Sequence, residues 1–200
     1  MRVGILVSGA GTNLQAILDR LHGHEGIRVV AVASDQPGAR ALERATGAGV
    51  PTGVFPLGPD REQRDTAIAD FLAGHRVELV VLAGFMALLT PSFLARFPGR
   101  VINVHPALLP AFPGLHAIEQ ALDYGVKVFG VTVHFVDEGV DTGPIIAQRA
   151  LELPDASDPG QVREALRPLE HDLLCEAIVQ IARGAVRQDP VHPRQVTVQR

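Results

Sequence analysis

The chain has 200 residues, a formal net charge of −4, 46% hydrophobic residues and 20% charged residues. This length is typical of one domain, and such a domain buries on the order of 70% of its unfolded surface, so neither disulfides nor a structural metal are needed for stability. The 18 cations are scattered along the chain, which argues against a nucleic-acid-binding surface. No apolar run reaches the roughly 18 residues of a membrane span, and the first residues do not resemble a signal peptide.

The chain contains one cysteine, Cys175, which rules out an internal disulfide. No spacing of cysteine and histidine resembles a zinc site, so we expect no metal. A single thiol in a protein without an export signal favours a reducing compartment. We therefore expect a cytoplasmic protein with small-molecule partners and neither nucleic acid nor membrane among them.

The first half of the chain alternates short apolar runs with amphipathic segments of helical spacing. Runs rich in Val, Ile and Leu suit strands that are buried on both faces, and a strand followed each time by a helix predicts a parallel sheet. The fold class that we expect is a doubly wound, mostly parallel α/β sheet with helices on both faces. Its predicted strands are residues 3–7, 29–33, 53–55, 79–82 and 101–104.

After residue 104 the pattern changes to a proline-rich loop, a short helix near residues 117–123 and two strands at 126–136 and 145–151. The segment 137–144 between these strands has no room for a crossover helix, so we expect an antiparallel addition to the sheet. A final helical pattern runs to about Arg183, and Pro168 predicts two helices or a kink there. We expect one domain over residues 1–200, with residues 184–200 as a peripheral tail.

Polar and glycine-rich residues follow the first predicted strand, at residues 8–13. Backbone amides at the start of the next helix favour an anion such as a phosphate, and glycines let a ligand approach the backbone. The loop matches neither the dinucleotide-binding turn nor the P-loop. The same residues also suit a turn that only caps the helix, with Thr12 as the N-cap.

Two further strand ends carry candidate chemistry. Asn103 and His105 are two apart on an extended segment and so point to one face, where an amide can stabilise an oxyanion and an imidazole can move a proton. The 137–144 loop supplies three carboxylates, Asp137, Glu138 and Asp141, and a carboxylate near His105 would raise the pKa of that imidazole. Structural roles for His105 and a turn role for the carboxylates remain open alternatives.

Four sets of residues follow one another along the chain in a family pattern: 8–17, 82–86, 103–110 with 112–116, and 133–136 with 141–144. They resemble the folate-dependent formyltransferase superfamily, most closely its members that act on a glycinamide ribonucleotide. The resemblance implies a Rossmann-like fold with a phosphate-binding loop, and formyl transfer from 10-formyltetrahydrofolate to an amine of the ribonucleotide in purine biosynthesis.

The resemblance also implies roles for individual residues. Catalytic roles fall to Asn103, His105 and Asp141, with Asp141 raising the pKa of His105. The ribonucleotide would be bound by Gly11, Thr12, Asn13 and Glu170, although Glu170 could instead cap a helix after Pro168. The folate would be bound by Arg61, Met86, Ala87, Leu88, Leu89, Asn103 and His134.

Other functions remain to be weighed. Formyltetrahydrofolate hydrolases and transferases that act on methionyl-tRNA share this catalytic core but usually carry an additional domain, for which we expect no room in 200 residues. A non-catalytic nucleotide-binding domain would not need polar residues at three strand ends. The sequence is compatible with a monomer or a homodimer.

Overall fold

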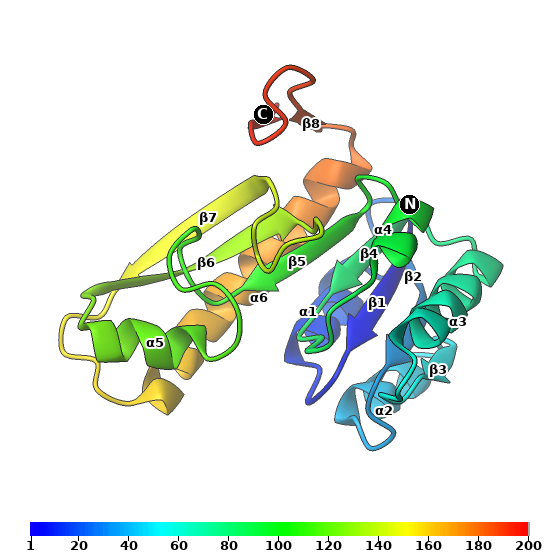
Figure 1. Cartoon of the computed structure of the whole chain (residues 1–200), viewed down its shortest axis with the longest axis horizontal. Helices are drawn as coiled ribbons and strands as arrows, with labels where there is room; N and C mark the ends of the chain where they lie inside the picture. The colour runs from blue at the N-terminus through cyan, green and yellow to red at the C-terminus, as the bar shows by residue number, and fades with distance from the viewer. Residues whose placement is uncertain (200) are drawn as a thin grey trace. The chain divides into compact units, whose positions relative to one another are not determined.

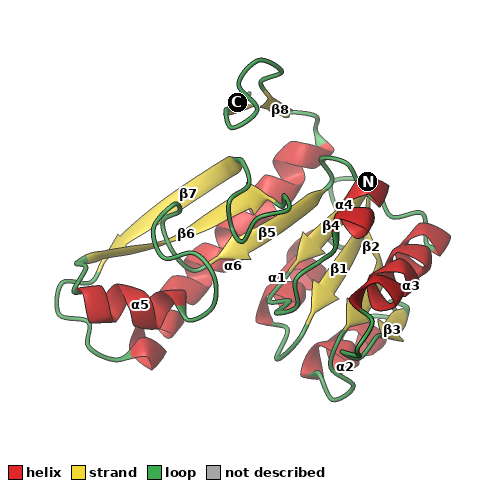
Figure 2. Ribbon diagram, in the orientation of Figure 1, coloured by secondary structure: helices red, strands yellow, loops and turns green. Residues whose placement is uncertain are grey.

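The structure, a computed structural model, describes residues 1–199 and divides into two compact units, one up to Asn103 and one from Val104 onward. The strands of the main sheet follow the order β3-β2-β1-β4-β5-β6-β7, and a separate two-stranded sheet joins β8 to β9. Figure 1 follows the chain by colour and Figure 2 separates its helices from its strands. This is the expected doubly wound, mostly parallel fold.

The first unit alternates strands and helices, and all of its strand pairings are parallel. Across the sheet, the chain moves in one direction from β1 through β2 to β3, and in the opposite direction from β3 through β4 to β5. Because the crossover connections are right-handed, the helices of these two sets of connections lie on opposite faces of the sheet. Accordingly, α1 packs beside α2 and α3 beside α4 (Figure 2). The elements are β1 (Arg2–Val7), α1 (Thr12–Leu21), β2 (Arg28–Ser34), α2 (Arg40–Gly47), β3 (Thr52–Val54), α3 (Arg61–Gly74), β4 (Leu79–Leu82), α4 (Pro91–Arg96) and β5 (Val101–His105).

Burial on both faces explains the apolar strands of this unit. Every residue of β4 is buried, and Ile5 and Leu6 of β1 have no exposed surface. Each such side chain stabilises the fold by about 1.5–3 kcal/mol. The helix α4 was not predicted, although Thr90 accepts a hydrogen bond from the Phe93 amide as its N-cap and Pro91 occupies its first turn, which is a typical helix start.

The second unit contains an antiparallel pair and a long helix. Strand β6 (Val128–Phe135) pairs with β7 (Ile145–Glu152), as predicted. The chain also forms α5 (Ala117–Tyr124), α6 (Pro159–Ala182), β8 (Val186–Gln188) and β9 (Val196–Val198). The peptide bond between Leu109 and Pro110 is cis.

Of the two alternatives expected at Pro168, two separate helices is wrong, because α6 is one helix of 24 residues with Pro168 inside it. Proline removes one backbone hydrogen bond and its ring crowds the preceding turn, at a cost of about 3 kcal/mol or more. Buried side chains on both sides of Pro168, from Val162 to Ile178, offset that cost. Among residues 1–199, no helix combines the length and hydropathy needed to cross a membrane.

The expected peripheral tail contains regular structure. Strands β8 and β9 pair antiparallel between Val186 and Val198. From the turn between them, Arg194 Nη1 donates a hydrogen bond of 3.0 Å to the carbonyl oxygen of Thr142. The C-terminal hairpin therefore contacts the loop that carries Asp141.

The turn between β1 and α1 depends on Gly11, which is the N-cap of α1 at a φ of 72°. The alternative with Thr12 as the N-cap is wrong, because Thr12 is already the first helical residue. A Cβ atom on Gly11 would lie 2.6 Å from the Cβ and 2.8 Å from the Cα of Ala41 in α2. Only glycine fits both the backbone conformation and this close approach.

Replacing Gly11 with alanine should lower the free energy of unfolding by about 2 kcal/mol or more, because a left-handed alanine alone costs about 1–2 kcal/mol. Gly9→Ala is the matched control, since nothing lies within 4 Å of its added Cβ. Urea denaturation followed by circular dichroism compares the two variants with the wild type. Equal losses of stability in both variants would contradict the steric role of Gly11.

Candidate active site

The carboxyl ends of parallel strands meet at one edge of a sheet, and ligands of open α/β sheets bind there. In the first unit, residues 8–13 follow β1, residues 83–90 follow β4, and Asn103 lies near the end of β5. Asn103 is half-buried while its neighbours Ile102 and Val104 are buried. The structure thus places three of the predicted segments at the edge where a ligand is expected.

The glycine loop, residues 8–13, is braced by α2. The Ala41 amide donates to the Gly9 carbonyl oxygen at 3.1 Å, and Arg44 Nε donates to the Ala10 carbonyl oxygen at 2.8 Å. Arg44 Nη1 also donates to Gln15 Oε1 at 2.9 Å. Sequence reasoning missed Arg44, because its place beside the loop depends on the packing of α1 against α2. The guanidinium adds positive charge to a helix N-terminus that already favours anions.

Ser8 connects the glycine loop to the segment after β4. Its amide donates to the Gly84 carbonyl oxygen at 3.0 Å, and its Oγ accepts a hydrogen bond of 2.9 Å from the Met86 amide. Met86 and Leu88 are 59% and 55% exposed, so they do not pack in the core. Apolar side chains that face solvent beside anchored backbone can contact a flat ring.

Arg61 and Glu170 lie in helices. Arg61 is an exposed residue in the first turn of α3, where Asp60 is the N-cap and accepts from the Gln63 amide. Glu170 is half-buried in the middle of α6, so the alternative that it caps a helix is wrong. Arg167, one turn earlier, pairs with Glu164 at 2.5 Å.

In the second unit, the structure brings His105 and Asp141 together. His105 is 4% exposed, and its Nδ1 lies 3.4 Å from Asp141 Oδ2. Its Nε2 lies 2.8 Å from the carbonyl oxygen of Phe112. Carboxylate and carbonyl oxygens only accept hydrogen bonds, so each ring nitrogen of His105 faces an acceptor. The geometry thus fixes the orientation of the imidazole ring.

His134 lies on the other side of the same carboxylate. Its Nε2 is 3.5 Å from Asp141 Oδ1, its Nδ1 is 2.8 Å from the carbonyl oxygen of Phe135, and its side chain is 2% exposed. Asp141 therefore lies between two buried imidazoles. The contact between His134 and Asp141 was not predicted, because it requires the end of β6 and the 137–144 loop to fold against each other.

The environment of Asp141 holds it ionised. Burial raises the pKa of Asp141, but hydrogen bonds from His134 and from the Gly114 amide lower it. The positive charges of the two imidazoles lower it further, and the pKa ends below its ordinary value. The Gly114 amide donates to Oδ2 at 2.7 Å, and Asp141 itself has a φ of 52°. Asp141 is therefore a carboxylate where it faces the two imidazoles.

Asn103 precedes His105 by two residues in β5, and residues two apart on a strand project to the same face. An amide donor and an imidazole are groups that can stabilise a developing oxyanion and transfer a proton. Among residues 1–199 no group of three or more His, Cys, Asp or Glu side chains is arranged to hold a metal ion.

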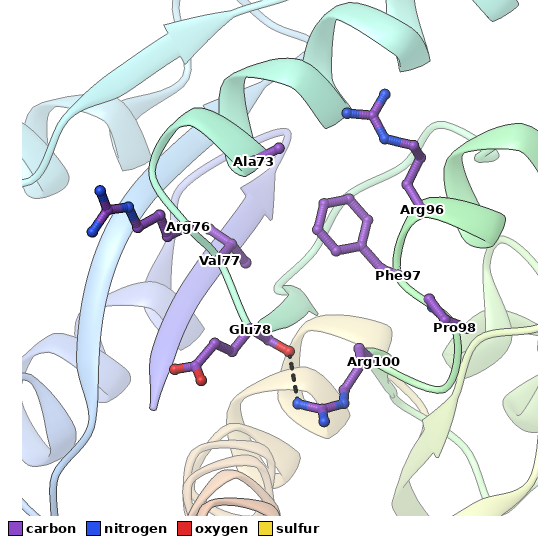
Figure 3. A pocket seen from close by; sticks show the side chains of 8 residues that line it. All are labelled: Ala73, Arg76, Val77, Glu78, Arg96, Phe97, Pro98 and Arg100. Carbon is purple, nitrogen blue, oxygen red and sulfur yellow. Dashed lines mark hydrogen bonds between the residues drawn. The ribbon is translucent and has the colours of Figure 1, made fainter.

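A pocket of about 490 Å³ lies elsewhere in the first unit, before the first residues of β4 and β5. Figure 3 shows the Arg76 side chain pointing away from Arg96 and Arg100, so the three cations do not converge on one point. Arg100 Nη1 donates instead to the Glu78 carbonyl oxygen at 3.3 Å. Because its lining residues precede β4 and β5, this pocket lies at the opposite ends of these strands from the predicted site residues of the first unit. Its lining residues are Ala73, Arg76, Val77, Glu78, Arg96, Phe97, Pro98 and Arg100.

Comparison with known proteins identifies the family of the chain. The chain is 46% identical over 187 residues to the phosphoribosylglycinamide formyltransferase of Mycobacterium tuberculosis, which covers 92% of this chain and 86% of that protein. It is 42% identical over 192 residues to the trifunctional purine biosynthetic protein adenosine-3 of Drosophila pseudoobscura, covering 94% of this chain and 14% of that protein.

A crystal structure of glycinamide ribonucleotide transformylase 1 from Symbiobacterium toebii superimposes with a TM-score of 0.95 at 44% identity, covering 100% of this chain and 94% of that one. Residues 1–178 match the formyl transferase family. With a family match over most of its length and relatives at these identities, the chain belongs to the formyl transferase family.

Proposed function

We propose that this protein transfers the formyl group of 10-formyltetrahydrofolate to the amine of 5'-phosphoribosylglycinamide, a step of purine biosynthesis. The observation that carries the proposal is the buried His105, which faces acceptors at both ring nitrogens and lies 3.4 Å from the Asp141 carboxylate. An imidazole held in this way suits acyl transfer to an amine. The relatives named phosphoribosylglycinamide formyltransferase support the choice of acceptor.

The reaction proceeds by direct attack. The amine nitrogen of the ribonucleotide forms a bond to the formyl carbon, and the carbonyl oxygen becomes an oxyanion. The amide of Asn103 donates a hydrogen bond to that oxyanion. The Nδ1–H of His105 donates a second one in place of its long contact of 3.4 Å with Asp141, while Nε2 stays beside the Phe112 carbonyl oxygen. The bond from the formyl carbon to N10 of the folate then breaks, N10 takes up a proton, and the attacking nitrogen loses one.

The ribonucleotide phosphate binds at Gly11, Thr12 and Asn13, where helix α1 begins. The N-cap of α1 makes no side-chain hydrogen bond, and the first amides of a helix attract phosphate oxygens. Glu170 contacts the same substrate through ribose hydroxyls. The folate is bound by Arg61, Asn103 and His134 together with the backbone of Met86, Ala87, Leu88 and Leu89.

The decisive experiment mixes the purified protein with 10-formyltetrahydrofolate and follows the folate product with and without the ribonucleotide. We expect product only when the amine is present. Equal product formation without the amine would overturn the transferase proposal in favour of a hydrolase. Binding of the ribonucleotide with no product under either condition would indicate a non-catalytic nucleotide-binding domain.

Replacing His105 with alanine should lower kcat by about 10²–10⁴, as expected when a general acid is removed. Folate affinity, measured by fluorescence titration, should stay within about twofold, because the variant leaves the 86–89 segment unchanged. His24→Ala, at an exposed position in the first unit, is the control and should keep the wild-type rate. A kcat unchanged in His105→Ala would reject its catalytic role.

Replacing Asp141 with asparagine should change how stability depends on pH. Because the pKa of Asp141 is lowered in the folded state, its carboxylate contributes stability above the pKa of the unfolded chain, about 3.9. That contribution is lost as pH falls through the folded pKa. The wild type should therefore be more stable than the variant at pH 6, and the difference should shrink towards pH 3.

Asparagine tolerates the left-handed backbone at position 141, so this variant changes charge more than conformation. Thermal or urea denaturation of both proteins across pH 3–7 measures the difference. A constant difference in the free energy of unfolding over that range would show that the Asp141 charge does not interact with the two imidazoles.

A further inference from the structure

Two neighbouring residues of α3 form a buried ion pair that the proposed mechanism does not use. Arg64 is 8% exposed and Asp65 has no exposed surface. Arg64 Nε donates to Asp65 Oδ1 at 2.8 Å, and Arg64 Nη2 lies 2.6 Å from the same oxygen. Taking both charges out of water is costly, and an apolar pair of similar volume is often as stable. The pair therefore calls for a role beyond holding the core together.

Both members of the pair also hold backbone groups of the segment after β4. Arg64 Nη2 donates to the Leu88 carbonyl oxygen at 2.9 Å. Asp65 Oδ2 accepts from the Thr90 amide at 2.6 Å. In the same segment, Ser8 Oγ accepts a hydrogen bond from the Met86 amide. Three side chains therefore hold the backbone at every second residue of the segment, at positions 86, 88 and 90.

This anchored segment is the one to which the proposed function assigns folate recognition. The side chains of Met86 and Leu88 are exposed, so local apolar packing does little to fix its backbone. Backbone groups that recognise a ligand must be held in place before the ligand binds. Otherwise the entropy lost in ordering the loop on binding reduces the affinity. A planar guanidinium is suited to hold a carboxylate and a carbonyl at once.

We propose that Arg64 and Asp65 are positioning residues that preset the backbone of residues 86–89 for the folate, and so control folate affinity rather than the chemical step. The inference rests on the proposed function, because it assigns the folate to this segment. A rival role is purely structural: the pair would join α3 to the start of α4 and thereby stabilise the whole unit.

The double variant Arg64→Met/Asp65→Asn separates these roles. Asparagine keeps an acceptor for the Thr90 amide, and removing both charges together avoids leaving one buried and unpaired. The variant therefore removes mainly the contact with the Leu88 carbonyl oxygen. The matched control is Arg96→Met/Asp70→Asn, because this exposed pair also joins α4 to α3, with Arg96 Nη2 2.9 Å from Asp70 Oδ1.

We expect the Arg64→Met/Asp65→Asn protein to show a folate KM about tenfold higher, the change that loss of one charge-assisted hydrogen bond produces. Its kcat and its KM for the ribonucleotide should stay within about twofold of the wild type. Direct titration with 10-formyltetrahydrofolate should show the same tenfold loss of affinity. The control variant should match the wild type in all of these values.

An unchanged folate KM, or equal increases in both KM values, would overturn the positioning role and leave the pair a structural one. Should the double variant fail to fold, Arg64→Lys replaces it. The lysine ammonium keeps a partner for Asp65 but lacks the second nitrogen with which Arg64 also donates to the Leu88 carbonyl oxygen. The same selective rise in folate KM is then expected. A wild-type protein that neither binds folate nor transfers formyl overturns the proposed function and this inference together.

Discussion

Parallel pairing of fully buried strands is the constraint on which the first unit depends. Because β1 pairs with β2 on one side and β4 on the other, the segments that follow these strands must emerge at the same edge. Not all backbone N–H and C=O groups of these segments can form hydrogen bonds within helices or strands there. The unit satisfies them with side chains instead, through Ser8, Arg44, Arg64 and Asp65. The proposed ligand-binding loops are thus shaped by polar contacts, whereas the sheet beneath them is stabilised by burial.

The second unit contains a carboxylate that stays charged although it is largely buried. Asp141 remains ionised because a backbone amide and two imidazoles compensate for its burial. His105 in turn finds an acceptor at each ring nitrogen. Each group would be unfavourable alone, and the cluster is acceptable only because its members satisfy one another. A site with these properties can stabilise a negative oxygen and move a proton without a large rearrangement.

Much of this molecule could be predicted from its sequence, since hydrophobic periodicity placed β1 to β5 and the antiparallel β6 and β7. The pairing of His105 with Asp141 was foreseen from the family resemblance, whereas the residues alone left three carboxylates of the 137–144 loop open. Contacts that depend on tertiary packing were not: Arg44 reaches the glycine loop from α2, His134 turns towards Asp141, and Arg64 reaches Leu88 from α3. Local rules also misjudged Gly11 and Pro168, because close packing against Ala41 and burial along α6 outweighed them.

The left-handed backbone at Asp141 restricts which amino acids can evolve at this position. Apart from glycine, only asparagine and aspartate, and less often histidine, are common at such φ values. Of these, aspartate alone is negatively charged at neutral pH. Glutamate would keep the charge but strain the backbone, and asparagine would keep the backbone but lose the charge. A lineage that kept a negative charge at position 141 without aspartate would thus have to accept a strained backbone or change the conformation of the 137–144 loop.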